Sequence, residues 1–344
     1  MKAAVLTGIR RMEVREAPDL KVEKGTDVLL KIERVGVCGS DVHYFETGRI
    51  GSQVVKFPFI VGHECAATVV AVGKAVKRVR VGDQVVVEPA VSCHDCDQCR
   101  RGRENTCFKL RFLGTPGQGD GCLRESLIMP EECCFPIRGA LTLEQGALCE
   151  PLAIAVYAVK QSHLPAKADV AVLGAGPIGL SCMTVARAQG ARTCYMTEKI
   201  AERVKLAADN GATWVGNPLK EDIVAEILKR QPLGMDVVYE CAGQQETIDQ
   251  GVELLRAGGT LMLVGIPRED RISLSIDKIR RKEVTIINVR RQNGCTQAAM
   301  DLIASGKVNV DFMVTHRFGL EDVQDAFEMV AGYRDGAVKA MIEM

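Results

Sequence analysis

Residues 171–180 read AVLGAGPIGL, and this stretch decides the fold of the chain. It places the pattern G-x-G-x-x-G directly after an apolar run and at the start of a helix-like segment. Glycines at these positions permit a tight turn and a close approach of the backbone to a pyrophosphate, whose charge the free N–H groups of the helix N-terminus can hold. Three glycines at this spacing are a weak signal alone, but the strand, turn and helix around them predict a dinucleotide-binding loop. The loop residues expected to bind the dinucleotide are Gly174, Gly176, Pro177, Ile178 and Gly179.

Glu198 comes at the end of the next strand-like run, 193–197. A carboxylate there can accept hydrogen bonds from the adenosine ribose hydroxyls and would repel a 2′-phosphate, which favours NAD over NADP. Two nearby cations, Lys199 and Arg203, weaken this preference, and Arg203 is itself counted among the expected cofactor-binding residues. The alternative for Glu198 is a solvated strand end.

Working outward from the loop, strand-like runs alternate with longer amphipathic segments from residue 168 onward. This alternation is typical of βαβ units and a doubly wound parallel sheet, which we expect to span 153–290. Residues 1–152 contain short β-branched runs broken by glycine, such as 28–32 and 67–72, and predict a compact β-rich unit with long functional loops. A helix-like run at 296–305 and a strand-like end at 337–344 suggest that 291–344 returns to that first unit. The expected fold class is therefore α/β with two domains.

The composition is that of an ordinary globular protein, with 47% apolar and 26% charged residues. Lys plus Arg equals Asp plus Glu, at 44 each, so no net charge attracts nucleic acid or an anionic membrane. A small molecule is the expected partner. The sequence shows no secretory leader and no apolar stretch of the roughly 18 residues needed to cross a bilayer, which predicts a cytoplasmic protein.

Fourteen cysteines in a reducing compartment are expected to be packed, catalytic or metal-bound, and their spacing decides which. Cys93, Cys96, Cys99 and Cys107 form C-x2-C-x2-C-x7-C in a polar loop at about 90–110 that has little to bury. Four thiolates on one short loop match a closed tetrahedral zinc site, which leaves no position open for substrate. We expect a structural zinc here. The alternative is a set of unpaired loop thiols.

A second metal site is predicted from Cys38 and from the run Gly62-His63-Glu64. A thiolate, an imidazole and a carboxylate can bind zinc and leave a position for water or an alcohol, as catalysis requires. Glu150, just before a proline, is a candidate fourth ligand or partner of the bound water. Cys65 and Cys149 lie beside these residues and are interpreted as packed core, because a single cysteine in an apolar run is usually buried.

Ser40 and His43 follow Cys38 closely and can pass the proton of an alcohol outward through the cofactor ribose. From the residues alone, the favoured interpretation of His43 is a surface or packed histidine.

At this point the chain resembles the zinc-containing medium-chain dehydrogenases, and within them the sorbitol (polyol) dehydrogenase branch. The resemblance covers essentially the whole chain. It includes the stretches 37–44, 48–51, 62–64, 81–85 and 149–152 and the four-cysteine loop.

The resemblance implies a GroES-like catalytic domain built from both ends of the chain, a Rossmann domain between them and an active site in the cleft. It implies two zinc ions per chain and NAD, with NADP the less expected cofactor. Cys38, His63 and Glu64 fall on the positions that hold the catalytic metal in the polyol branch, and Glu150 on that of the water partner. Ser40 and His43 fall on the proton-relay positions. Tyr44, Phe112 and Arg290 occupy positions that line the polyol pocket, and relatives are commonly homodimers or homotetramers.

One departure concerns the substrate. After Arg290, where the polyol enzymes often carry tyrosine, this chain has Arg291. A second guanidinium can bind a carboxylate with two hydrogen bonds, which suggests a sugar acid instead of a neutral polyol. The alternative is that Arg291 faces solvent or a subunit interface.

The expected activity is reversible oxidation of a secondary alcohol of a polyol or sugar derivative to a ketone by NAD. A threonine 3-dehydrogenase or butanediol dehydrogenase is the alternative within the class. From another class, the alternative is a dinucleotide-binding protein without catalysis, but that would predict broken metal ligands or a missing relay.

Overall fold

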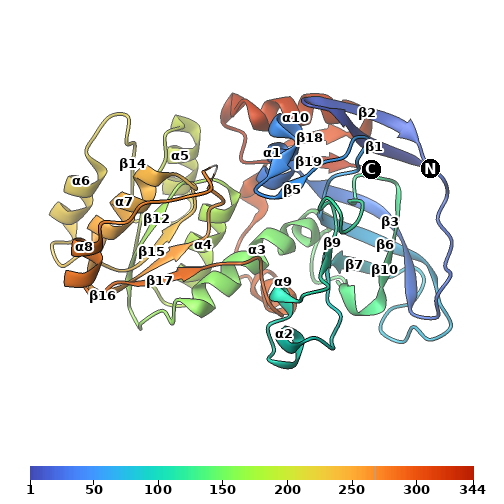
Figure 1. Ribbon diagram of the computed structural model, residues 1–344, viewed down its shortest axis with the longest axis horizontal. Coiled ribbons are helices and arrows are strands. Elements are labelled where there is room, and N and C mark those ends of the chain that lie inside the picture. The colour runs from blue at the N-terminus through green and yellow to red at the C-terminus, as the bar shows by residue number, and fades with distance from the viewer. Residues whose placement is uncertain (268) are drawn as a thin grey trace. The chain divides into compact units, whose positions relative to one another are not determined.

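The computed structural model describes residues 1–267 and 269–344, which divide into two compact units (Figure 1). Unit 1 contains Met1–Glu150, Thr296–Gly306 and Val310–Met344, and unit 2 contains Pro151–Cys295 and Lys307–Asn309. Unit 1 is therefore built from both ends of the chain, and unit 2 from its middle.

Unit 1 is organised around a sheet of seven strands in the order β11-β7-β6-β3-β19-β18, with β10 also paired to β3. Its strands are β3 (Asp27–Gly36), β6 (Glu64–Val72), β7 (Gln84–Val87), β10 (Ser126–Pro130), β11 (Cys134–Pro136), β18 (Val314–Gly319) and β19 (Lys339–Glu343). A separate hairpin joins β1 (Lys2–Gly8) to β2 (Arg11–Glu16), and two small pairs join β4 (Arg49–Ile50) to β5 (Gln53–Val54) and β8 (Ala90–Val91) to β9 (Arg111–Phe112). The helices that lie wholly in unit 1 are α1 (Gly39–Thr47), α2 (Asp97–Arg100), α9 (Thr296–Ala304) and α10 (Val323–Ala331).

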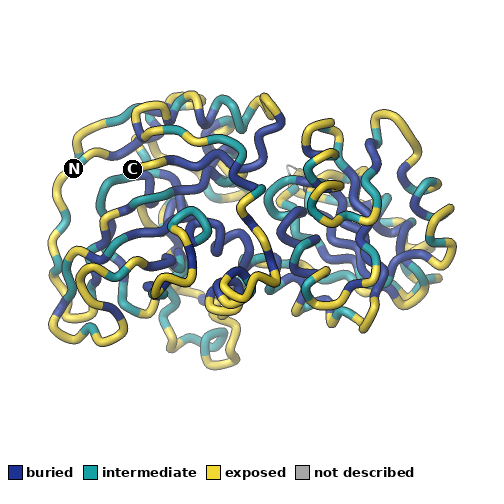
Figure 2. The backbone as a smooth tube through the Cα atoms, turned by 180° about the vertical axis from the view of Figure 1, so that it is seen from behind, coloured by how far each residue is buried: buried dark blue, intermediate teal, exposed yellow. Residues whose placement is uncertain are grey.

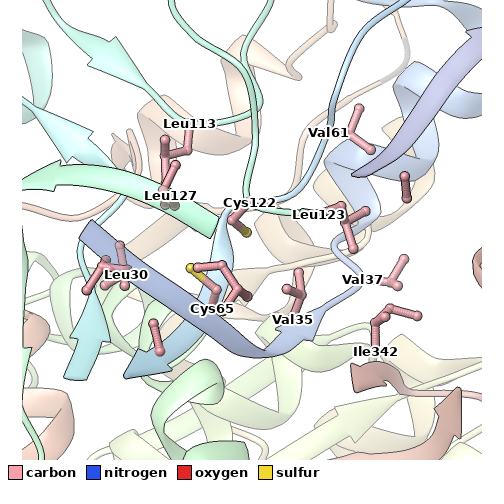
Figure 3. Close-up of a cluster of buried hydrophobic side chains, with 14 of the residues drawn as sticks. Leu30, Val35, Val37, Val61, Cys65, Leu113, Cys122, Leu123, Leu127 and Ile342 are labelled. Atoms are coloured by element: carbon pink, nitrogen blue, oxygen red, sulfur yellow. The ribbon is translucent and has the colours of Figure 1, made fainter. Parts of the chain in front are cut away.

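The core of unit 1 forms because apolar side chains alternate along its strands. In β3, Val28, Leu30 and Ile32 point to one face and are fully buried. They belong to a cluster that extends through Cys65, Cys122 and Leu127. Figure 3 shows Leu30 and these three side chains close to β3. Figure 2 shows the same division along the backbone, with buried strands inside and exposed loops outside. Cys65 and Cys149 are buried, which confirms their interpretation as core.

Unit 2 is a six-stranded sheet in the order β14-β13-β12-β15-β16-β17, and every pair in it is parallel. The strands are β12 (Asp169–Leu173), β13 (Thr193–Thr197), β14 (Trp214–Gly216), β15 (Met235–Glu240), β16 (Leu255–Leu263) and β17 (Thr285–Asn288). The helices are α4 (Pro177–Ala188), α5 (Ala201–Asp209), α6 (Ile223–Arg230), α7 (Gln245–Leu254) and α8 (Ile276–Arg281), and α3 (Leu143–Gln161) carries residues of both units.

The order of these strands reverses at β12, because β13 lies on one side of it and β15 on the other. This is the doubly wound arrangement, in which ligands bind outside the carboxyl ends of the strands at the point of reversal. The prediction of a parallel sheet is confirmed, and its last strand, β17, lies within the expected span 153–290. The strands of this sheet are nearly continuous apolar runs because helices cover both faces, and all five residues of β12 are buried.

Within the described residues, no helix combines the length and the hydropathy that a membrane crossing requires.

Candidate functional site

Cys38, His63 and Glu64 meet in unit 1 because β3 and β6 are neighbours. Gly36 at the end of β3 pairs with Glu64 at the start of β6, and Cys38 follows two residues after that pair at the N-terminus of α1. One ligand atom from each of the three side chains lies within 4.8 Å of the others. Ligand atoms about 2.0–2.3 Å from a single zinc ion fit this spacing, and the thiolate, imidazole and carboxylate are zinc ligands by chemistry.

Asp41 orients the imidazole of His63. Its Oδ1 lies 3.3 Å from Nδ1 of His63 and also accepts a hydrogen bond from the backbone N–H of Gly62, at 3.2 Å. Burial lowers the pKa of His63, but the negative charges of Asp41 and Cys38 outweigh it and raise that pKa well above its usual value. A hydrogen bond at Nδ1 leaves Nε2 to face a metal, which is how carboxylates fix metal-binding histidines. Sequence reasoning missed Asp41, although it lies in the same motif as Cys38.

Lys339 pairs with Glu64 in the interior of unit 1. Both side chains are 1% exposed, and Nζ of Lys339 lies 2.5 Å from Oε2 of Glu64 and 3.2 Å from the carbonyl oxygen of Val37. Burial lowers the pKa of Lys339, but Glu64 and Cys38 more than offset this and raise it. Gly36 makes room for the pair, because a Cβ on it would lie 2.3 Å from Oε2 of Glu64. Nothing in the sequence singles out this lysine.

Glu150 is a further buried acidic group whose charge interacts with His63 and Glu64. It lies in α3, is 6% exposed, and its Oε2 has no hydrogen-bond partner among the residues that the structure describes. Burial raises the pKa of Glu150 to about 8, with His63 acting in the opposite direction and Glu64 in the same one. A buried carboxyl oxygen without a donor is costly unless a metal or a water engages it. The group therefore fits the role of a metal or water ligand.

The remaining site residues predicted in unit 1 lie on α1 and β9. Ser40 donates a hydrogen bond to Sγ of Cys38 at 3.3 Å, and His43 follows three residues later on the same side of α1. The ring of Phe112 lies 5.4 Å from that of His63, at 56°. Tyr44 is 3% exposed and donates its hydroxyl to Oε1 of Gln53 at 3.2 Å.

The four loop cysteines also come together, within 4.8 Å of one another. The sulfur atoms of Cys93 and Cys107 are 3.4 Å apart, and those of Cys96 and Cys99 are 3.5 Å apart. A zinc tetrahedron with Zn–S bonds of about 2.3 Å has S···S edges of about 3.8 Å, close to these values. Backbone N–H groups of Cys99 and Phe108 lower the pKa of Cys96 to about 6, so this thiol is readily ionised for a metal.

The dinucleotide loop connects β12 to α4 in unit 2. Gly174 has a φ of +102°, and Gly179 allows the helix to begin close to the strand, since a Cβ there would lie 1.9 Å from the carbonyl oxygen of Gly174. Gly176 caps α4, and Pro177 and Ile178 form its first turn. The N-terminus of α4 therefore has the geometry that binds a pyrophosphate.

Glu198 follows β13, the neighbour of β12, and its carboxylate turns toward the loop. It accepts hydrogen bonds from the backbone N–H groups of Ala175 at 3.0 Å and Lys199 at 2.7 Å. Arg203 of α5 is 6% exposed, and a Cβ on Gly176 would lie 3.9 Å from its Nη1. The structure thus assembles all the predicted cofactor residues at one edge of the sheet of unit 2.

Arg290 and Arg291 follow β17 in unit 2. Arg290 is exposed, while Arg291 is partly buried and has a φ of +54°, an unusual conformation for a residue with a long side chain.

Comparison with known proteins identifies the class. Residues 24–139 match the alcohol dehydrogenase GroES-like domain, and residues 177–305 match the zinc-binding dehydrogenase family. The chain is 36% identical over 343 residues to a sorbitol dehydrogenase of Bacillus subtilis (strain 168), covering 99% of this chain and 97% of that protein. It is 34% identical to an L-idonate 5-dehydrogenase of Vitis vinifera, covering 99% and 94%. A zinc-binding dehydrogenase from Sinorhizobium meliloti 1021, solved with NADP bound, has a TM-score of 0.92 at 32% identity and covers 100% of this chain and 99% of that one.

The chain is a zinc-binding dehydrogenase with a GroES-like domain and a Rossmann domain. Within that class it belongs to the polyol dehydrogenase branch of the zinc-dependent medium-chain dehydrogenases. It is an oxidoreductase that acts on the alcohol groups of polyols or sugar derivatives, and it uses zinc and a nicotinamide dinucleotide. These predictions from the sequence are confirmed.

Proposed function

We propose that Cys38, His63 and Glu64 hold the catalytic zinc of this dehydrogenase, with Glu150 as a further ligand or as the acceptor for a zinc-bound water. The carrying observation is the convergence of three ligand atoms within 4.8 Å beside a buried carboxyl oxygen that no described residue engages. When bound, zinc acts as a Lewis acid that lowers the pKa of the substrate hydroxyl.

The chain's own residues then prepare the reaction. Asp41 holds His63 in the tautomer that presents Nε2, and Lys339 fixes one oxygen of Glu64. Ser40 and His43 carry the substrate proton outward from the site, because both lie on α1 next to Cys38. Tyr44 and Phe112 are assigned to the walls of the substrate site in unit 1, and Phe112 also packs beside His63 and keeps water from that side.

The dinucleotide is assigned to the loop from Gly174 to Gly179, with Glu198 and Arg203 at the ribose. We favour NAD, because the carboxylate of Glu198 stands beside the loop and opposes a 2′-phosphate. Arg203 is the residue that works against this preference. The second zinc is assigned to the four cysteines at 93–107, where all four positions are protein ligands and the role is structural.

Steady-state initial rates test the proposed function. The purified enzyme is assayed against polyols, sugar acids, inositols, threonine and 2,3-butanediol, with NAD and with NADP. We expect the highest kcat/KM for a secondary alcohol of a polyol or sugar derivative with NAD. A higher value for threonine or butanediol would replace the proposed substrate class, and a higher value with NADP would replace the cofactor assignment.

Arg291 is the residue we assign to the choice between a neutral polyol and a sugar acid. If its guanidinium binds a substrate carboxylate, Arg291→Tyr should lower kcat/KM for sugar acids by about tenfold to a hundredfold, as the loss of a charge-assisted hydrogen-bond pair predicts. Rates for neutral polyols should stay within about twofold. Arg291→Lys is the matched variant, since it keeps a cation at the same position but lacks the planar pair of donors. Unchanged relative rates after Arg291→Tyr would remove the sugar-acid assignment.

Three further assignments stay proposals. The functional domains are 1–152, 153–290 and 291–344, and the protein is cytoplasmic. We also propose that the protein is a homodimer or homotetramer. In support, β17 is the last strand in the order of its sheet, and an open edge strand can pair with the same strand of a second copy.

A further inference from the structure

Glu240 is a buried acidic residue to which the reaction described above gives no role. It is the last residue of β15, which lies between β12 and β16, and it is 1% exposed. A carboxyl group is rarely buried to this degree unless its hydrogen bonds do something that an apolar side chain cannot. Its position is informative, since the carboxyl ends of parallel strands at the point of reversal form the ligand-binding edge of such a sheet.

The side chain of Glu240 fixes the loop that follows β15. Its Oε1 accepts three hydrogen bonds: from the backbone N–H of Ala242 at 2.8 Å, from that of Gly243 at 2.7 Å, and from the hydroxyl of Thr247 at 2.7 Å. Thr247 lies in the first turn of α7, so a single carboxyl oxygen ties the loop 241–244 to the start of the next helix.

The backbone of Glu240 fixes a second loop, the one that follows β16. Its carbonyl oxygen accepts hydrogen bonds from the N–H groups of Val264 and Gly265, both at 2.9 Å. One residue therefore determines the conformation of two loops at the ligand-binding edge.

These loops have no room to move independently. A Cβ on Gly243 would lie 2.5 Å from the carbonyl oxygen of Ile266, and a Cβ on Gly265 would lie 2.4 Å from the backbone N of Gly243. On the other side, a Cβ on Gly174 of the dinucleotide loop would lie 3.3 Å from Cβ of Ala242. The loop 241–244 is thus packed between the dinucleotide loop and the loop after β16, and a shift in it displaces both.

The second carboxyl oxygen of Glu240 makes the buried carboxyl group energetically costly, so good packing alone does not account for a glutamate at this position. Oε2 is buried and has no hydrogen-bond partner in residues 1–267 and 269–344, and a Cβ on Gly265 would lie 2.8 Å from it. Burial raises the pKa of Glu240, and the hydrogen bond from Thr247 and those from the backbone oppose that rise. The fold keeps this costly carboxyl for the three hydrogen bonds at Oε1.

We propose that Glu240 is a positioning residue for the dinucleotide, which holds the loops after β15 and β16 in the conformation that the dinucleotide binds. This inference rests on dinucleotide binding by unit 2. It assigns Glu240 no contact with the reacting atoms.

Binding of NADH to the full-length, zinc-loaded enzyme tests the proposal, with the dissociation constant measured by fluorescence and zinc measured in the same samples. We expect Glu240→Ala to raise the Kd of NADH by about tenfold or more, through the loss of several hydrogen bonds. Glu240→Gln should lose less, because its carbonyl oxygen can accept the same bonds. Zinc content and the KM for the polyol should not change, whereas the KM for NAD should rise.

Thr247→Val keeps the test decisive if Glu240→Ala does not fold, because it removes one donor to Oε1 and nearly preserves the shape. It should raise the Kd of NADH by about threefold. Asp249→Ala, at an exposed position of the same helix, is the matched control and should leave the Kd unchanged.

A wild-type Kd in Glu240→Ala and Thr247→Val, even with lowered melting temperatures, would overturn the proposal and leave Glu240 a purely structural residue. If the wild-type enzyme itself does not bind NADH, the assignment of the dinucleotide to unit 2 fails first, and that outcome is distinguishable because all variants then behave alike.

Discussion

Replacing Cys38 with alanine should reduce the zinc content from two ions per chain to one and the rate by about a thousandfold or more. The reason is that a metal ion contributes several kcal/mol of transition-state stabilisation, and each 1.36 kcal/mol is a factor of ten in rate. The four-cysteine site is made by other residues and should keep its zinc. Elemental analysis together with steady-state kinetics on the same preparation checks both parts.

Cys65→Ala is the matched control for that experiment. Cys65 directly follows Glu64 in sequence, but its side chain is 1% exposed and packs in the core of unit 1 (Figure 3). The Cys65→Ala variant should keep both zinc ions. Its unfolding free energy should fall by roughly 1 kcal/mol, because the substitution leaves a small cavity. Two zinc ions in Cys38→Ala, or zinc found only at the four cysteines of the wild-type protein, would contradict the assignment of the catalytic site.

The second large effect is expected at Lys339. Lys339→Met leaves the carboxylate of Glu64 buried without its cation, and breaking a buried pair in this way costs about 3–5 kcal/mol of unfolding free energy. Both side chains are 1% exposed, so little solvent screens the loss. Urea unfolding of the wild-type protein and of Lys339→Met, followed with a probe in unit 1, measures this loss of unfolding free energy. Zinc should reduce the loss, because the metal gives Glu64 a new positive partner.

Lys31→Met serves as the comparison, because Lys31 also pairs with a glutamate of the same sheet but has 57% of its side chain exposed. An exposed pair of this kind contributes at most about 1 kcal/mol. Equal losses of unfolding free energy in Lys339→Met and Lys31→Met would show that the buried Lys339–Glu64 pair stabilises unit 1 no more than an exposed pair does.

Lys339 and Lys31 look alike in the sequence and differ only in burial, so a sequence pattern alone does not distinguish them. The loop at 174–179, the four cysteines and the triad of Cys38, His63 and Glu64 were predictable because their chemistry depends on residue type at short spacing. The glycine pattern indicates a dinucleotide loop only where it falls between a strand and a helix. Four thiols on one polar loop have few functions other than binding a metal. The alternation of strands and helices predicted the parallel sheet for a similar reason, since a buried strand and an amphipathic helix have different periods.

Lys339 and Asp41 were not predictable in this way. Lys339 lies 275 residues from Glu64 in sequence, and only the pairing of β19 with β3 brings it beside the site. Asp41 lies within the Cys38 motif, but its role depends on His63, just before β6, whose Nδ1 lies 3.3 Å from Oδ1 of Asp41. In the sequence both are ordinary charged residues, which are usually solvated.

By itself, then, the sequence determined the class of this enzyme. It also predicted two sets of zinc ligands and a loop for the dinucleotide, because each is a local pattern that few chemistries share. Only the tertiary structure decided which charged groups are buried: the pair of Lys339 and Glu64, the carboxyl group of Glu150, and Glu240 at the end of β15. Burial is a property of the packed chain. It is also what turns an ordinary charge into one that orients a ligand or a loop, because a charge removed from water must find its partners within the fold.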